Sequence, residues 1–143
     1  MADWTLIIED EKGLRALAAH LAPLLKTGDT VTLAGDLGTG KTAFARALIQ
    51  ALSPLPEEVP SPTFTLVQVY DLPRIVIWHF DLYRLEEARD IESLALEDAL
   101  AEPAVVLIEW PERFSLHTDW PKIKVQLEHL EGDTRRITIS GSS

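Results

Sequence analysis

The sequence predicts one α/β domain over residues 1–143, in which helices flank a mixed, mainly parallel central sheet that ends in a C-terminal β-hairpin. Three observations support this fold class. The length of 143 residues fits a single domain, and a hydrophobic content of 46% suffices to bury a core. Segments with a hydrophobic period of two alternate with segments of helical period. A glycine-rich turn also connects an apolar strand to an amphipathic helix.

The N-terminal part of the chain is predicted to run strand, helix, strand, helix. Residues 4–8 alternate as a short strand does, and Asp10 can cap a following helix that Gly28 ends. That helix carries one apolar stripe, formed by Leu14, Leu17, Ala18, Leu21, Leu24 and Leu25. Residues 30–34 are a β-rich run, and a second helix is expected over 41–52. The face of the second helix that we expect to be buried consists of Phe44, Leu48, Ala51 and Leu52.

The middle of the chain is predicted to hold a surface loop and a pair of strands. Residues 53–62 contain four prolines and two glutamates, a composition that fits neither a helix nor a central strand. Strands are expected over 65–70 and 75–80. The turn at 71–74 between them is short, which favours antiparallel pairing.

The C-terminal part is predicted to add a helix, a central strand and a hairpin. Residues 85–102 are acidic and favour a helix. Its apolar positions are Ile91, Leu94, Leu96 and Leu100. The continuous apolar run at 104–108 predicts a buried central strand. Residues 123–127 and 136–139 alternate around a turn at 131–133, which is the pattern of a hairpin with one wet face.

Composition and charge exclude several classes of function. The 23 acidic and 13 basic residues leave a net charge of −10, which disfavours non-specific binding to nucleic-acid phosphates and argues against DNA as a partner. The absence of cysteine excludes disulfides, thiolate zinc sites and cysteine nucleophiles. The absence of asparagine excludes the Asn-Lys-x-Asp signature of GTPases. No apolar run reaches the roughly 18 residues of a membrane span, and the N-terminus lacks a secretion-signal pattern, so we expect a cytoplasmic protein without a membrane partner.

A phosphate-binding loop is the strongest functional signal in the sequence. Residues 35–42 match the pattern G-x-x-x-x-G-K-T in full, between a predicted strand and a predicted helix, so the fold is expected to be a P-loop NTPase-like sandwich. Backbone N–H groups of such a loop point at phosphates, and the helix N-terminus adds its dipole. The residues expected to bind the nucleotide are Gly35, Asp36, Leu37, Gly38, Thr39, Gly40, Lys41 and Thr42. Lys41 is expected to bridge the β- and γ-phosphates, and the Thr42 hydroxyl to bind magnesium. The alternative is a glycine turn that only connects strand to helix.

Two acids are candidates for the second metal-facing carboxylate that such a loop needs. Asp81 and Glu109 each end an apolar run, and ligands of open α/β sheets bind at the carboxyl ends of the strands. We assign Glu109 to magnesium because the run before it is uninterrupted. Trp78 and His79 indicate a less buried strand before Asp81, which would then position water or a switch loop. The alternative for either acid is a solvated strand end.

Thr63 and Trp110 are candidates for coupling to a nucleotide or a partner. Thr63 follows the proline-rich loop and can swing onto magnesium or the γ-phosphate, as switch threonines do, or it can simply begin a strand. Trp110 directly follows Glu109, on the opposite face of the strand. We interpret its large ring as core rather than as a partner anchor.

Among the remaining polar residues, Arg84 and Arg135 are candidate partners of phosphate or carboxylate through their planar guanidinium groups. For each arginine alone, a solvated surface position is favoured. His79 is interpreted as a structural histidine, because two side chains make a poor transition-metal site, and the same holds for His117 beside Asp119.

Four motifs together resemble a known family. They are the loop at 35–42, Ser-Pro-Thr-Phe-Thr-Leu-Val at 61–67, His-Phe-Asp-Leu-Tyr-Arg-Leu at 79–85 and Ile-Glu-Trp-Pro-Glu at 108–112. Their order and spacing closely resemble those of the TsaE (YjeE) family. The resemblance implies an ATPase, with ATP and Mg²⁺ as its ligands, that is required for making threonylcarbamoyladenosine beside the anticodon of tRNAs. It also implies the TsaD and TsaB subunits, which perform the transfer, as partners, and tRNA only indirectly through them.

The resemblance also assigns roles to individual residues. Lys41 and Thr42 would hold phosphate and magnesium, and Glu109 would be the magnesium ligand. Asp81 and Trp110 would be functionally important. The two further positions are Thr63, in the family's switch-like loop, and Arg135, where the family often has an arginine near the nucleotide.

Two other functions compete with that of an accessory ATPase. A small-molecule kinase would need an acceptor pocket and an arginine-bearing lid, for which 143 residues leave little room. A non-hydrolytic module would use bound ATP only to order segments for docking. The sequence offers neither a clear general base nor an arginine finger, so we expect ATP hydrolysis by the isolated protein to be weak.

Overall fold

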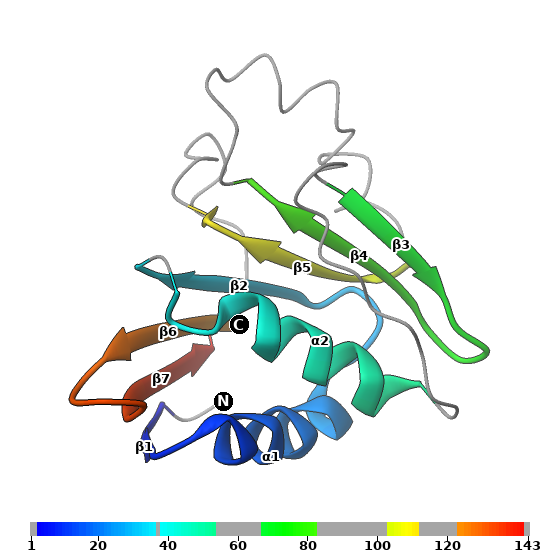
Figure 1. The fold of residues 1–143 in the computed structure, drawn as a ribbon. Coiled ribbons are helices and arrows are strands. Elements are labelled where there is room, and N and C mark those ends of the chain that lie inside the picture. Colours follow the sequence, from blue (N-terminus) through cyan, green and yellow to red (C-terminus); the bar gives the residue numbers. More distant parts are fainter. Residues whose placement is uncertain (1–2, 37, 54–66, 83–102, 112–122, 142–143) are drawn as a thin grey trace.

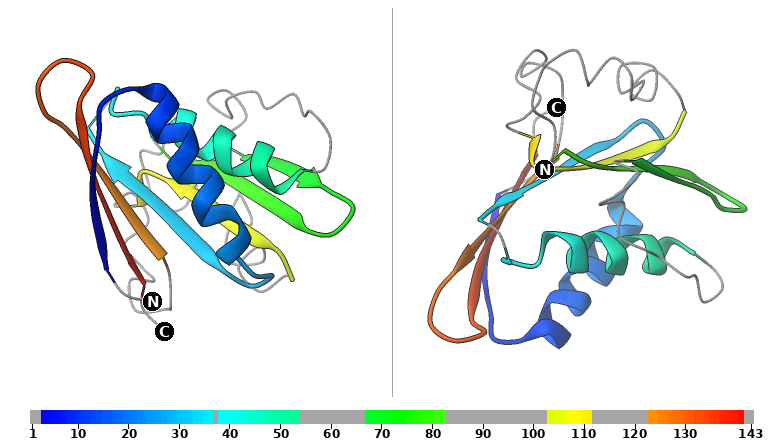
Figure 2. Two further views of the ribbon diagram at one scale, coloured as in Figure 1. Left: turned by 90° about the horizontal axis from the view of Figure 1, so that it is seen from below. Right: turned by 45° about the horizontal axis from the view of Figure 1, so that its top comes forward.

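The protein is described by a computed structural model that covers residues 3–36, 38–53, 67–82, 103–111 and 123–141. Within these ranges the chain forms one seven-stranded sheet with both α-helices on the same face, as Figures 1 and 2 show. The elements in chain order are β1 (Trp4–Ile8), α1 (Glu11–Leu21), the 3-10 turn η1 (Ala22–Leu24), β2 (Thr30–Gly35), α2 (Lys41–Leu52), β3 (Val67–Asp71), β4 (Val76–Asp81), β5 (Val105–Glu109), β6 (Ile123–His129) and β7 (Arg135–Gly141).

The sheet is mixed, as predicted, and its parallel part occupies the centre. The strand order is β1-β7-β6-β2-β5-β4-β3. The four inner strands β6, β2, β5 and β4 are mutually parallel, whereas β1–β7, β6–β7 and β3–β4 are antiparallel. The predicted C-terminal hairpin is therefore confirmed as β6–β7, and the predicted pair at 65–80 as β3–β4. The apolar run at 104–108 is confirmed as β5, an inner strand buried at all of its positions.

The first helix begins as predicted and ends earlier than predicted. Asp10 caps α1 by accepting a hydrogen bond from the Gly13 backbone N–H to Oδ1 at 2.8 Å. The expectation that the helix continues to Gly28 is wrong, because Pro23 has no N–H to donate and its ring crowds the preceding turn. The chain passes into η1 instead, and Leu24, predicted to be buried, is 46% exposed.

The buried face of α2 is rotated from the predicted one. Phe44 and Leu48 are buried as expected, but the stripe also includes Ala45 and Ile49, while Ala51 is exposed. With about 100° of rotation per residue, Ala51 lies at the margin of that stripe. The stripe faces the sheet together with α1, and the two helices and the sheet enclose the core.

The strand before Asp81 is less buried than the one before Glu109, as predicted, because Val76 and Trp78 of β4 are only partly buried, whereas every position of β5 is buried. His79, Phe80 and Asp81 in β4 are all buried, because β4 lies between β5 and β3 rather than at an edge. The predicted loop at 54–62 and the predicted helix at 85–102 lie outside the described residues. Within the described ranges, neither helix is long and apolar enough to cross a membrane.

Replacement of two leucines from the predicted stripe tests where α1 ends. Leu21→Ala is expected to lower the free energy of unfolding by about 2–5 kcal/mol, because the side chain has no exposed surface. Leu24→Ala should cost about 1 kcal/mol or less, because Leu24 is already half exposed. Urea denaturation followed by circular dichroism measures both. Equal losses would contradict the early end of the helix.

Candidate functional site

The candidate site lies where the carboxyl ends of β2, β5 and β4 meet. The parallel register sets Leu33 beside Glu109 and Asp81 beside Glu109. The Trp110 N–H donates to the Leu33 carbonyl at 3.1 Å, so the pairing of β2 and β5 continues beyond the strand end. β4 and β5 end in the two candidate acids, so these acids lie at the same end of the sheet as the loop that follows β2; Figure 1 shows the three strand ends together.

The loop from Gly35 to Gly40 has a backbone that requires glycine. Gly35, Gly38 and Gly40 have φ values of 149°, 80° and 105°, which L side chains rarely adopt. A Cβ at Gly35 would also overlap the Leu127 carbonyl oxygen of β6. Thr39 closes the turn by donating from Oγ1 to the Asp36 carbonyl at 2.8 Å. The predicted loop thus has the compact glycine-dependent form expected of a phosphate cradle, and its Leu37 lies outside the described residues.

Lys41, the first residue of α2, directs its ammonium group back across this loop. Nζ donates to the carbonyls of Gly35 at 2.6 Å and Asp36 at 2.8 Å. Nζ also lies 3.9 Å from the centre of the Trp110 ring. Lys41 is only 5% exposed, so its charge is confined to the place where a phosphate would have to lie.

Thr42 and Glu109, which the sequence assigned to magnesium, lie in direct contact. Thr42 Oγ1 donates to Glu109 Oε1 at 2.7 Å, across 67 positions of sequence. His79 Nε2 lies 2.7 Å from the other carboxylate oxygen, Oε2. No group of three or more His, Asp or Glu side chains within the described ranges is arranged to hold a metal. That is compatible with Mg²⁺, which proteins usually hold through one or two side chains together with water and phosphate. Metal binding itself stays a prediction.

Asp81 is the second acid at this edge. It is buried and lies level with Glu109 in the register of β4 and β5. The Leu82 N–H donates to the Glu109 carbonyl at 3.1 Å, which holds the ends of the two strands together. The structure thus brings both predicted acids to the loop, while the role of Asp81 stays a prediction.

Arg135 approaches the loop from β7, and the surface position favoured for it is wrong. Its Nη1 lies 3.2 Å from where a Cβ on Gly40 would be. Nε and Nη1 are buried and have no hydrogen-bond partner among the described residues. Buried guanidinium N–H donors are normally paired with an anion or a carbonyl, so their position against the loop favours an anionic ligand.

Trp110 was interpreted as core, and the structure corrects this. Its side chain is half-buried over Lys41, and its φ of 61° makes it the one residue other than glycine with positive φ in the described ranges. The prediction assumed that side chains alternate between the two faces of the strand as far as Trp110. β5 ends at Glu109, so this alternation does not determine where the Trp110 side chain lies. The other candidates Thr63, Arg84, His117 and Asp119 lie outside the described residues.

His79 makes a contact at this site that the sequence analysis did not predict. It was interpreted as structural, and in the structure it is fully buried with its ring against Glu109. Two positions upstream of Asp81, it shares a face of β4 with that acid. In the sequence, this shared face was the one sign that His79 could lie near the acids. It indicates a contact with Glu109 only once β4 is known to pair with β5.

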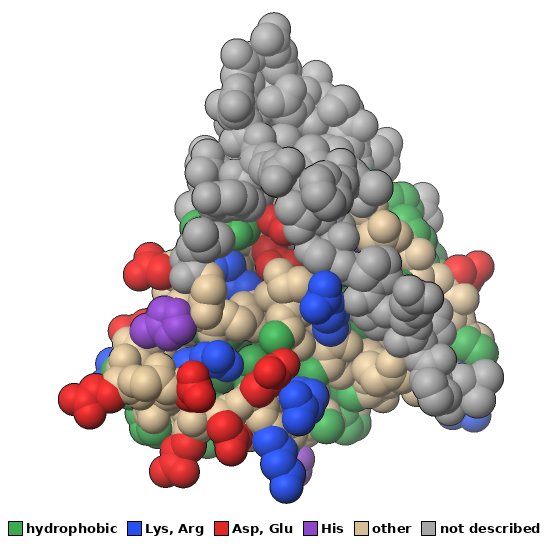
Figure 3. Space-filling view, viewed as in Figure 1, with side chains coloured by type: hydrophobic (Ala, Val, Ile, Leu, Met, Phe, Trp, Pro, Cys, Tyr) green, Lys and Arg blue, Asp and Glu red, His purple; other side chains and the backbone are tan. Residues whose placement is uncertain are grey.

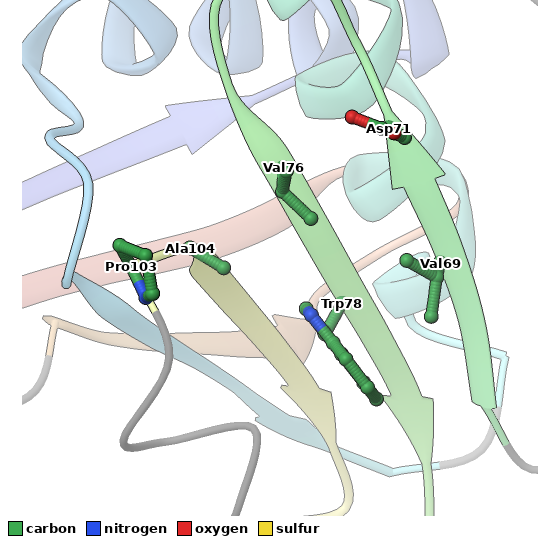
Figure 4. A pocket seen from close by; sticks show the side chains of 6 residues that line it. All are labelled: Val69, Asp71, Val76, Trp78, Pro103 and Ala104. Carbon is green, nitrogen blue, oxygen red and sulfur yellow. The ribbon is translucent and has the colours of Figure 1, made fainter.

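A separate cavity of about 370 Å³ lies far from the loop. Its lining residues, shown in Figure 4, are Val69, Asp71, Val76, Trp78, Pro103 and Ala104. They lie on the face of β3 and β4 opposite to Ile77 and His79, near the beginnings of β4 and β5. This cavity is therefore not part of the loop site.

The charges on the visible helix face are mixed. Figure 3 shows acidic and basic side chains interspersed over it, without a broad area of Lys and Arg in its described part. The net charge of the whole sequence is −10, and the expectation of no non-specific nucleic-acid binding stays a prediction.

Known proteins share both the sequence and the fold. The family model described as threonylcarbamoyl adenosine biosynthesis protein TsaE matches residues 8–137. The tRNA threonylcarbamoyladenosine biosynthesis protein TsaE of Rickettsia felis is 40% identical over 138 residues, which cover 96% of this chain and 80% of that protein. The protein of the same name from Bacillus subtilis is 31% identical over 137 residues, or 96% and 84% of the two chains. The crystal structure of Bacillus subtilis YdiB matches with a TM-score of 0.83 at 24% identity, covering 99% of this chain and 87% of that one, which shows the shared fold.

Two glycine variants test the tight packing of the loop. Gly35→Ala and Gly28→Ala both introduce a side chain at positive φ, which costs about 1–2 kcal/mol. Only the alanine at position 35 meets other atoms, whereas the space around Gly28 is open. We expect Gly35→Ala to lose at least about 1 kcal/mol more in the free energy of unfolding, measured in urea. A loss at position 28 as large as that at position 35 would argue against the close approach of β6.

Proposed function

Because the chain belongs to the TsaE family, whose model is that of a threonylcarbamoyl adenosine biosynthesis protein, we propose that it serves tRNA threonylcarbamoyladenosine modification as a Mg²⁺-dependent, weakly hydrolysing ATPase. The observation that carries the ATP-binding part is the convergence of two cations on the glycine loop. Lys41 Nζ lies inside the loop, and Arg135 presents beside Gly40 buried N–H donors that have no partner in the part of the chain that the structure describes. Both groups suit the phosphates of a nucleotide.

The residues at the strand ends suit a divalent cation. Thr42 and Glu109 would hold Mg²⁺, through a hydroxyl and a carboxylate that already lie together. Bound Mg²⁺ would offset the negative charge of the phosphates during hydrolysis. Asp81, buried beside Glu109, would orient water, and Trp110 would cover the ammonium group of Lys41.

We further propose that the activity depends on partner subunits. The family resemblance points to TsaD and TsaB as partners and to tRNA bound through them, and the net charge of −10 agrees with an indirect tRNA contact. A P-loop protein without an arginine finger hydrolyses slowly until a partner supplies what is missing. A kinase function is less well supported, because 143 residues leave little room for an acceptor pocket and an arginine-bearing lid.

Two single substitutions should have different effects, one on nucleotide binding and the other on metal-dependent turnover. Lys41→Ala should abolish nucleotide binding, because it removes the ammonium group from the loop. Glu109→Ala should retain binding without metal and mainly weaken Mg²⁺-dependent turnover. Calorimetric titration with ATP, with Mg²⁺ or with EDTA, measures the difference. Lys124→Ala and Glu131→Ala, at exposed positions, are the controls. Equal loss of binding in both site variants would refute this division.

The proposed function is tested by measuring phosphate release from ATP. We expect slow release by the protein alone and faster release with TsaD and TsaB, with a further measurement after addition of tRNA. Lys41→Ala provides the blank. If the partners change nothing, the accessory-ATPase role is refuted. If ATP binds and promotes assembly without release of phosphate, the protein is a non-hydrolytic docking module.

A further inference from the structure

Within the described ranges, His79 and Glu109 form the most deeply buried polar pair outside the glycine loop. Their side chains are 0% and 2% exposed, and His79 Nε2 lies 2.7 Å from Glu109 Oε2. The pair takes no direct part in holding phosphate, because Lys41 and Arg135 approach the loop from other elements. It therefore needs an explanation of its own.

The sheet register explains why these two residues meet. In the parallel pairing of β4 and β5, His79 lies beside Leu107 and Asp81 lies beside Glu109. His79 and Glu109 thus point to the same face of the sheet, with the histidine one step deeper than the carboxylate. From there the ring meets the side of Glu109 that Thr42 does not occupy.

The chemistry of the contact sets the direction of the hydrogen bond. An ionised carboxylate only accepts, so Nε2 carries the proton and donates it to Oε2. The other oxygen, Oε1, already accepts from the Thr42 hydroxyl at 2.7 Å. Both oxygens of Glu109 are therefore fixed, from α2 on one side and from β4 on the other.

The second ring nitrogen of His79, Nδ1, argues against a role in packing alone. Nδ1 is buried without a hydrogen-bond partner in the described part of the chain. An aliphatic side chain would fill this position without leaving a buried polar atom unpaired. The contact with Glu109 is thus the feature of His79 that an apolar residue could not replace.

We propose that His79 is a positioning residue for the metal site: it donates from Nε2 to Glu109 and holds the carboxylate beside Thr42 in the orientation that a divalent cation requires. This inference rests on the proposed function, because it assigns Glu109 to Mg²⁺. Groups that orient a metal ligand in this way commonly change metal affinity by about 10- to 100-fold when they are removed.

Three substitutions at position 79 separate positioning from packing. The amide nitrogen of His79→Gln reaches roughly the place of Nε2, whereas that of His79→Asn reaches only the place of Nδ1, and His79→Leu has no donor. Ile77→Val, two residues earlier on the same face of β4, is the packing control. Circular dichroism and thermal unfolding establish that each variant is folded.

The test measures how much Mg²⁺ is needed for tight binding of a non-hydrolysable ATP analogue. We expect His79→Asn and His79→Leu to raise the half-saturating Mg²⁺ concentration about 10- to 100-fold. His79→Gln and Ile77→Val should stay near the wild type, and the affinity in EDTA should not change in any variant. Loss of affinity in EDTA as well, or the same Mg²⁺ requirement for Gln, Asn and Leu, would overturn the inference. A wild-type chain that binds the analogue without any response to Mg²⁺ would refute the proposed metal dependence itself.

A second readout needs no nucleotide and serves if the substituted chains do not fold. Nitrogen-15 NMR of the ligand-free wild-type chain should show His79 as the Nε2–H tautomer, with a ring signal that shifts in Glu109→Gln. The Nδ1–H tautomer, or a ring signal that is insensitive to Glu109→Gln, would overturn the inference.

Discussion

The parallel pairing of β2 with β5 is the constraint on which the rest of the site depends. β2 leads into the glycine loop and β5 ends in Glu109, and their register sets Leu33 beside that acid. A shift of one residue would turn Glu109 to the opposite face of the sheet and separate it from Thr42. The apolar burial of both strands therefore fixes a polar contact at their ends. Packing of the core thus stabilises the fold and also places Glu109 beside Thr42.

Opposite charges gather at this edge in two separate groups. On the loop side are the ammonium of Lys41 and the guanidinium of Arg135, and on the strand side are the carboxylates of Asp81 and Glu109. Burial of charge is costly unless hydrogen bonds compensate. Glu109 has partners on both oxygens, whereas two donors of Arg135 have none within the described ranges. The cationic side is thus incompletely satisfied and the anionic side is preorganised. A phosphate and a divalent cation, which carry the complementary charges, would complete the two groups.

Most of the fold could be predicted from the sequence because its signals are local. The glycine loop, the Asp10 cap and the apolar run of β5 each lie within a few residues, and the structure contains all three elements. The features that were not predicted correctly depend on a proline within an apolar stripe or on the pairing of distant strands. The end of α1 depends on Pro23, beyond which the apolar stripe continues in the sequence. The contact of His79 with Glu109 depends on β4 lying beside β5. The placement of Arg135 against Gly40 likewise follows from the pairing of β7 with β6, which no short window of sequence contains.

The backbone at Trp110 shows how the loop and the strand end act as one unit. A bulky residue at a φ of 61° costs roughly 1–3 kcal/mol. The contact of its ring with Lys41 offsets about 0.5–2 kcal/mol, and its hydrogen bond to the Leu33 carbonyl about 1 kcal/mol. These contributions are comparable, so this conformation persists because both contacts are made at once. Since Lys41 also binds the carbonyls of Gly35 and Asp36, any displacement of its ammonium group changes the loop and the Trp110 contact together. The glycine loop is thereby linked mechanically to the strand end that carries Glu109.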